Sequence, residues 1–138
     1  MKKVVLPGIL AGVLMLIVGM GINYLMNLFV PALMVEYTTS GLFRPWEDPL
    51  MSLYFAYPIV LGLALAWFWN KTKSSFKGAS VFGRGASFGF ACFLIATIPG
   101  MLVTYASFDI SLGMVLSWTL MGIVDLLIAG FVFAKLNK

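Results

Sequence analysis

The stretch NKTKSSFKGASVFGR, residues 70–84, decides the fold of this chain. It holds Lys71, Lys73, Lys77 and Arg84 without an acidic residue, and long apolar stretches lie on both sides of it. Short loops rich in lysine and arginine stay on the cytoplasmic side of a membrane. The stretch, from residue 71 to 84, is therefore predicted to be an inner loop whose four basic side chains contact anionic lipid headgroups.

Four apolar stretches predict four membrane spans, at about residues 4–30, 50–70, 85–105 and 110–134. Each is long enough to cross the hydrocarbon core, which takes roughly 20 apolar residues in a helix. The chain has 138 residues, of which 62% are hydrophobic and 10% charged, and its mean hydropathy is +1.02. A soluble domain of this size lacks the interior to bury so much apolar surface. The predicted fold class is an all-α integral membrane protein, one compact four-helix bundle over residues 1–138.

The sorting of charge predicts the orientation of these spans. Both chain ends carry only basic residues, which are Lys2, Lys3, Lys135 and Lys138. The predicted outer loop, residues 31–49, holds Arg44 together with most of the acids. We therefore expect a multi-pass protein of the cytoplasmic (inner) membrane with both termini in the cytoplasm. The pI near 9.4 then reflects contact with lipid, and no nucleic-acid partner is expected.

Residues that end or begin helices agree with this layout. Pro31 is predicted to end the first span, and Asp48 before Pro49 is predicted to be an N-cap of the second. Asp109 precedes the fourth span in the same way. Trp67 and Trp69 are predicted to lie at the inner membrane interface, where aromatic residues gather.

Small residues recur along one face of every predicted span. Gly8 and Gly12 are four residues apart in the first span, as are Gly85 and Gly89 in the third. Such spacings bring helices close together, either within one bundle or between copies of a chain. The same rule places further residues on these faces: Gly19, Asn23 and Asn27; Pro58, Gly62 and Ala66; Cys92, Ala96 and Gly100; Trp118, Gly122, Asp125 and Ala129. The segments 48–71 and 109–135 also resemble each other weakly, which suggests two parallel hairpin repeats.

Asp125 is the only ionisable acid or base deep inside a predicted span. It lies ten residues before Lys135, roughly 15 Å from the cytoplasmic end of the helix. An unpaired carboxylate at that depth costs at least about 2.5–3.5 kcal/mol. Asp125 is therefore either a neutral acid in one interhelical hydrogen bond or a proton- or cation-linked site with Asn23, Asn27 and Thr97. The two asparagines could also act only to join helices.

The outer loop offers a second candidate surface, formed by Arg44, Trp46, Glu47 and Asp48. It could be a lid or a partner surface, since long loops are often functional. The alternative is that Trp46 anchors at the headgroups while Arg44 pairs with Glu47 or Asp48.

Residues suited to catalysis or metal binding are scarce. The chain has no histidine, and its single cysteine, Cys92, lies within an apolar stretch. No catalytic residue, metal site or cofactor is predicted, and we expect the protein not to be an enzyme.

Three functional classes remain. The sequence favours a non-enzymatic packing or assembly subunit, joined to copies of itself or to another membrane protein. The alternative is a small oligomeric transporter or channel that uses Asp125. A weaker alternative is a lipid-acting enzyme that uses the outer acids Glu36, Glu47 and Asp48.

Overall fold

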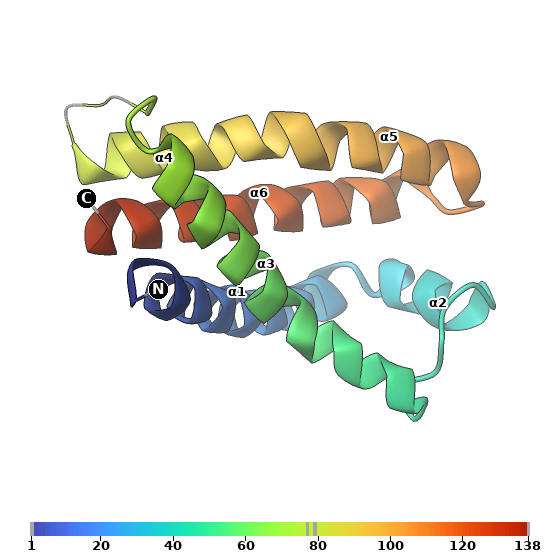
Figure 1. Ribbon diagram of the computed structural model, residues 1–138. Coiled ribbons are helices and arrows are strands. Elements are labelled where there is room, and N and C mark those ends of the chain that lie inside the picture. Colours follow the sequence, from blue (N-terminus) through green and yellow to red (C-terminus); the bar gives the residue numbers. More distant parts are fainter. Residues whose placement is uncertain (1, 77, 79, 138) are drawn as a thin grey trace.

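The computed structural model describes residues 2–76, 78 and 80–137, and every regular element among them is helical (Figure 1). Four stretches are long and apolar enough to span a membrane: Lys3–Phe29, Pro49–Thr72, Val81–Ser107 and Leu112–Leu136. The elements are α1 (Lys2–Phe29), α2 (Pro31–Thr39), the 3₁₀ turn η1 (Pro49–Met51), α3 (Ser52–Thr72), α4 (Val81–Cys92), the π-helical turn η2 (Phe93–Thr97), α5 (Ile98–Ser107) and α6 (Leu112–Leu136). The all-helical class is confirmed.

The two connecting loops are shorter than the sequence predicts. Residues 31–39 of the predicted outer loop form α2, because Pro31 both ends α1 and provides a preset first residue for a new helix. Gly83 and Arg84, expected in the inner loop, lie in α4. The Ser80 hydroxyl accepts a hydrogen bond from Gly83 N at 3.0 Å, so this cap starts the helix despite its glycines.

One of the two predicted helix caps is confirmed and the other is wrong. Asp48 Oδ1 accepts a hydrogen bond from Leu50 N at 2.9 Å and caps η1. Asp109 does not cap the last helix. Ser111 does, because its hydroxyl accepts from Met114 N at 3.1 Å and α6 begins only at Leu112.

Glycines hold the helices together in two crossings of the same design. In the first, Gly8 and Gly12 of α1 face Gly62 of α3, and a Cβ added at Gly12 would lie 2.7 Å from Pro58 O. In the second, Gly85 and Gly89 of α4 face Gly130 of α6. A Cβ added at Gly85 would lie 2.7 Å from Gly130 O. Both glycine pairs are thus used inside the chain, where backbone meets backbone.

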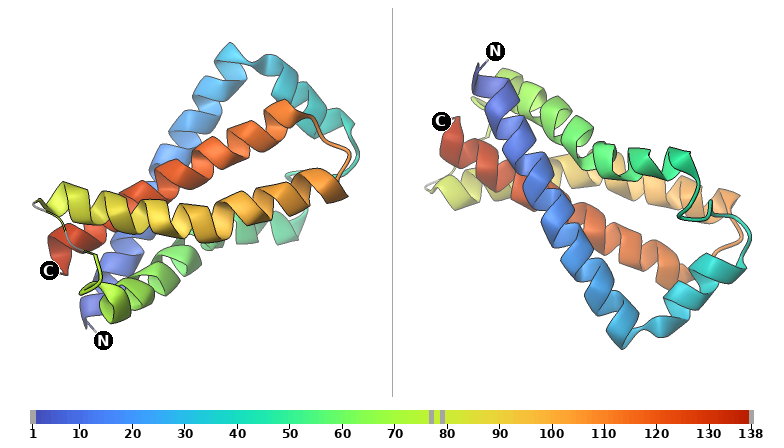
Figure 2. Two further views of the ribbon diagram at one scale, coloured as in Figure 1. Left: turned by 90° about the horizontal axis from the view of Figure 1, so that it is seen from above. Right: turned by 90° about the horizontal axis from the view of Figure 1, so that it is seen from below.

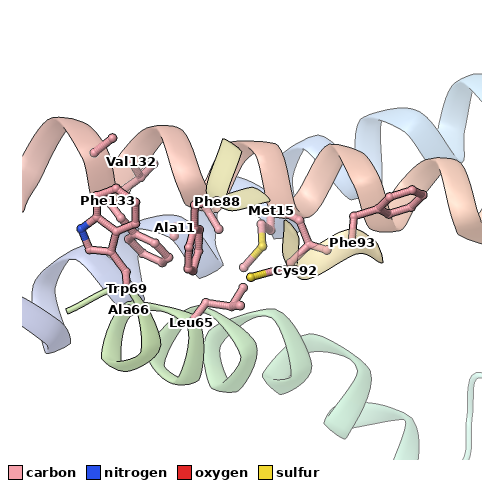
Figure 3. Packing of buried hydrophobic residues seen from close by; sticks show 13 residues of the cluster. Ala11, Met15, Leu65, Ala66, Trp69, Phe88, Cys92, Phe93, Val132 and Phe133 are labelled. Atoms are coloured by element: carbon pink, nitrogen blue, oxygen red, sulfur yellow. The ribbon is translucent and has the colours of Figure 1, made fainter. Parts of the chain in front are cut away.

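The densest packing lies at the end of the bundle that carries the two termini, here called the termini end. Trp69, Phe88, Phe133 and Met15 are the largest fully buried side chains (Figure 3). The rings of Trp69 and Phe88 meet edge to face with centroids 5.2 Å apart. Trp69 is therefore a core residue and not the interfacial anchor that the sequence predicts, because its side chain points toward the other helices.

Asn137 closes the termini end through a set of hydrogen bonds, here called the Asn137 clasp. Its carbonyl accepts from Trp69 Nε1 at 2.9 Å, and its Oδ1 accepts from Lys73 Nζ at 2.9 Å. Its Nδ2 donates to Lys3 O at 3.0 Å and to Asn70 Oδ1 at 3.3 Å. The clasp therefore joins the start of α1, the end of α3 and the end of α6.

The helices diverge away from this end. In both views of Figure 2, α1 runs away from α4 and α5 toward the opposite end, where α2 lies and which is here called the α2 end. The close crossings near the termini set these angles, because glycines let the backbones meet at one end only. The space between the diverging helices holds the candidate site.

Candidate functional site

A cavity of about 530 Å³ lies between α1, α2, α3, α5 and α6. Its walls are mostly apolar, with a few polar side chains, as in typical small-molecule sites. Seven of the nine methionines of the chain line it: Met15, Met20, Met26, Met34, Met101, Met114 and Met121. Five aromatic residues complete the walls, namely Tyr37, Trp46, Tyr54, Tyr57 and Trp118. The sequence analysis did not single out the methionines as a group, because they are scattered over five elements.

Asp125 faces this cavity from α6. It shares a helix face with Trp118 and Gly122, as the sequence predicts, and all three line the cavity. Its Oδ1 atom is buried and has no hydrogen-bond partner among the residues that the structure describes. The hydroxyl or amide that was expected to hold a neutral Asp125 is therefore not found at this oxygen.

Thr97 also reaches the cavity, and a π-helical turn brings it there. Pro99 has no N–H and its ring excludes the carbonyl four residues earlier, which favours such an irregularity. Ile98 N donates instead to Phe93 O, five residues back. A Cβ added at Gly122 would lie 2.8 Å from Thr97 Cγ2, so Thr97 packs directly against the turn of α6 that precedes Asp125.

The same turn ends the predicted stripe of small residues in the third span. Gly100, expected to continue the face formed by Gly85, Gly89 and Cys92, has no neighbouring atom within 4 Å of an added Cβ. The extra residue in η2 rotates α5 relative to α4, which a uniform helical period cannot describe. Pro99 was the available signal for this change.

Asn23 and Asn27 line the cavity near its α2 end. Asn27 Nδ2 donates to Asn23 Oδ1 at 3.1 Å. This bond runs along α1, so in the described part of the chain the two amides do not join separate helices. They offer polar groups to the cavity instead.

The predicted outer surface divides into two parts. Arg44 Nη1 pairs with Asp48 Oδ2 at 2.7 Å, one of the two pairings that the sequence suggested. The Leu50 backbone N–H and the Arg44 guanidinium hold the pKa of Asp48 below its usual range. Trp46 instead lines the cavity, with Tyr54 edge-on at 5.5 Å between centroids, and Glu47 is exposed. Only Trp46 of this group therefore belongs to the site.

Glu36 fastens α2 to the start of α6. Its Oε1 accepts a hydrogen bond from Ser111 N and its Oε2 accepts from Ser111 Oγ, both at 2.6 Å. The Ser111 hydroxyl, and after it the backbone N–H, lowers the pKa of Glu36 below its ordinary value of 4.5. Because Met34 and Tyr37 of α2 line the cavity, this latch holds one of its walls in place.

The latch makes the attachment of α2 dependent on pH. A carboxyl whose pKa is lowered by folding stabilises the fold above its unfolded pKa, and this contribution is lost as pH falls through the lower folded value. We expect amide hydrogen exchange in α2, corrected for its intrinsic pH dependence, to accelerate as pH falls below about 4.5. In Glu36→Gln it should already be fast at pH 7 and change little with pH. Glu47→Gln is the matched control and should behave like the wild type; equal behaviour of both variants would contradict the latch.

The predicted headgroup contacts differ in their surroundings. Lys71 is exposed at the end of α3, whereas Lys73 takes part in the Asn137 clasp. Arg84 lies 5.6 Å from the centre of the Trp69 ring, and its Nε donates to Phe76 O at 3.3 Å. Lys77 lies outside the described residues. Arg84 therefore has a role within the fold that the sequence analysis missed.

The acidic residues do not gather into a catalytic or metal-binding set. Glu36 binds Ser111 and Asp48 binds Arg44, and in the described chain no three His, Cys, Asp or Glu residues come together. No protein-family model matches the sequence, and comparisons with curated proteins and with solved structures give no significant match. The class is thus defined by the fold: an all-helical chain with four helices of membrane-spanning length and composition.

Proposed function

We propose that the protein is a small, non-enzymatic membrane carrier that binds a cation in the cavity and exchanges it for a proton at Asp125. One observation carries this proposal. A buried carboxylate oxygen without a hydrogen-bond partner faces a cavity of about 530 Å³. Carboxylates inside membrane spans are expensive and usually serve ion or proton pathways.

The charge pattern supports an orientation for this carrier. The basic residues at the termini end favour the cytoplasmic side of the inner membrane, so the α2 end and the wide part of the cavity would face outward. The repeated glycine crossing in α1–α3 and α4–α6 supports two parallel hairpin repeats. The packing-subunit alternative has less support, because Gly8, Gly12, Gly85 and Gly89 are covered within the chain.

Proton exchange in liposomes tests the proposal. Purified protein is reconstituted with a pH-sensitive dye inside, and the membrane potential is clamped with equal potassium and valinomycin. Sodium or tetraphenylphosphonium is then added outside in separate runs. We expect at least one of these cations to drive proton efflux, and the rate to fall at least about ten-fold in Asp125→Asn, which cannot release a proton.

Asp109→Asn is the matched control, because Asp109 is an exposed acid outside the cavity wall. It should exchange protons at the wild-type rate. If neither cation drives efflux faster in the wild type than in Asp125→Asn, the carrier function is wrong.

A further inference from the structure

We infer that the ligand of the cavity is an amphipathic organic cation, a molecule that carries one positive charge among aromatic or aliphatic groups. The inference rests on the proposed function and names the class of its substrate. It is drawn from three properties of the cavity: its charge, the chemistry of its walls and the number of its polar ligands.

The charge of the cavity favours a cation. Asp125 is the only acidic residue among the described residues that line it, and none of these residues is basic. The unpartnered Oδ1 therefore meets no positive side chain in the wall. A bound cation would supply the missing partner, whereas an anion would meet repulsion in a medium of low dielectric constant.

The walls favour a ligand with a large apolar surface. Methionine side chains are flexible and polarisable, so seven of them form a surface that adapts to ligands of different shapes. Aromatic faces attract cations, most strongly where water is excluded. Two of these rings are held in place from behind. Phe43 meets Trp118 edge-on at 5.9 Å, and Tyr54 meets Trp46 edge-on at 5.5 Å.

The few polar ligands argue against a divalent metal ion. Calcium takes six to eight oxygen ligands, and magnesium keeps an octahedral shell of oxygens. Asp125 provides the single carboxylate, while Asn23 and Asn27 already bond each other at 3.1 Å. The cavity volume of about 530 Å³ lies within the range of sites for molecules of drug size. An organic cation fits both facts.

Calorimetry with tetraphenylphosphonium tests the inference on the whole protein in lipid nanodiscs. We expect saturable binding to the wild type and at least about ten-fold weaker binding to Asp125→Asn. Trp118→Leu keeps an apolar side chain but removes the aromatic face, and it should weaken binding several-fold. Asp109→Asn should bind like the wild type. Tetraphenylborate has the same shape and the opposite charge, so it should show no binding that depends on Asp125.

The outcomes separate this inference from the proposed function. If sodium drives Asp125-dependent proton efflux while tetraphenylphosphonium neither binds nor drives it, the carrier remains and the substrate class is wrong. Equal binding of tetraphenylphosphonium to the wild type and Asp125→Asn also overturns the inference, because partition into lipid would explain it. Thermal unfolding of Asp125→Asn and Trp118→Leu shows whether each variant is folded. If Asp125→Asn is unfolded, Asp125→Glu replaces it, and wild-type affinity with the longer carboxylate supports the inference while loss of binding opposes it.

Discussion

Replacing Gly130 with alanine is expected to destabilise the folded protein by about 2–3 kcal/mol, although alanine favours helices over glycine by about 1 kcal/mol. The added Cβ would overlap the Gly85 carbonyl oxygen and lie 3.2 Å from Gly89 N. Gly62→Ala should act alike, since its Cβ would overlap the Gly8 carbonyl oxygen and lie 2.9 Å from Gly12 N. These neighbours are backbone atoms, so the helices themselves must separate.

Reversible unfolding in mixed micelles with increasing dodecyl sulfate, followed by circular dichroism, measures the effect. Gly21→Ala in α1 and Gly100→Ala in α5 are the matched controls, because an added Cβ finds no atom within 4 Å at either position. The controls should be neutral or more stable, by up to about 1 kcal/mol. The opposite signs identify close approach as the cause. Four variants of equal stability would show that the crossings do not hold the bundle.

Replacing Asn137 with leucine is expected to cost about 3 kcal/mol and to loosen the termini end. Asn137 is only 4% exposed, and its side chain serves groups from three parts of the chain. Leucine is of similar size but leaves the Lys3 carbonyl and the Asn70 amide without this donor. A buried polar group that loses its partner costs more than the hydrogen bond contributed.

The same unfolding assay measures this effect, with Asn27→Leu as the control. Asn27 is exposed and bonds only its neighbour one turn away, so its replacement should change the stability by less than about 0.5 kcal/mol. Hydrogen exchange of the first turn of α1 should accelerate in Asn137→Leu and not in Asn27→Leu. Equal stability of the two variants would show that the clasp contributes little.

The sequence predicts the long helices well because their apolar length is a local property. The ends at Phe29 and Thr72 fall within two residues of the predicted ones. The cap at Asp48 was also readable, since aspartate before proline is a local signal. The face shared by Trp118, Gly122 and Asp125 followed from the helical period, because α6 is regular throughout.

The rest depends on contacts between distant parts of the chain. Trp69 sits at the end of a span, where the positional rule predicts an interfacial anchor, but Asn137 lies 68 residues away and receives its indole N–H. Glu36 appeared as one acid of a loop, although its partner Ser111 is 75 residues distant. The cavity itself arises because the helices meet at glycines near one end and diverge toward the other. No single span contains that information.

The glycine crossings also give the molecule a lever. Since an α-helix rises about 1.5 Å per residue, Asn27 lies about 22 Å beyond Gly12, and a swing of about 10° at the crossing would carry Asn27 through about 4 Å. Helix surfaces without side chains at the fulcrum can rock with little rearrangement of their neighbours. A displacement too small to disturb Trp69 and Phe133 is thus magnified into a gape at the far end, wide enough to exchange a solute.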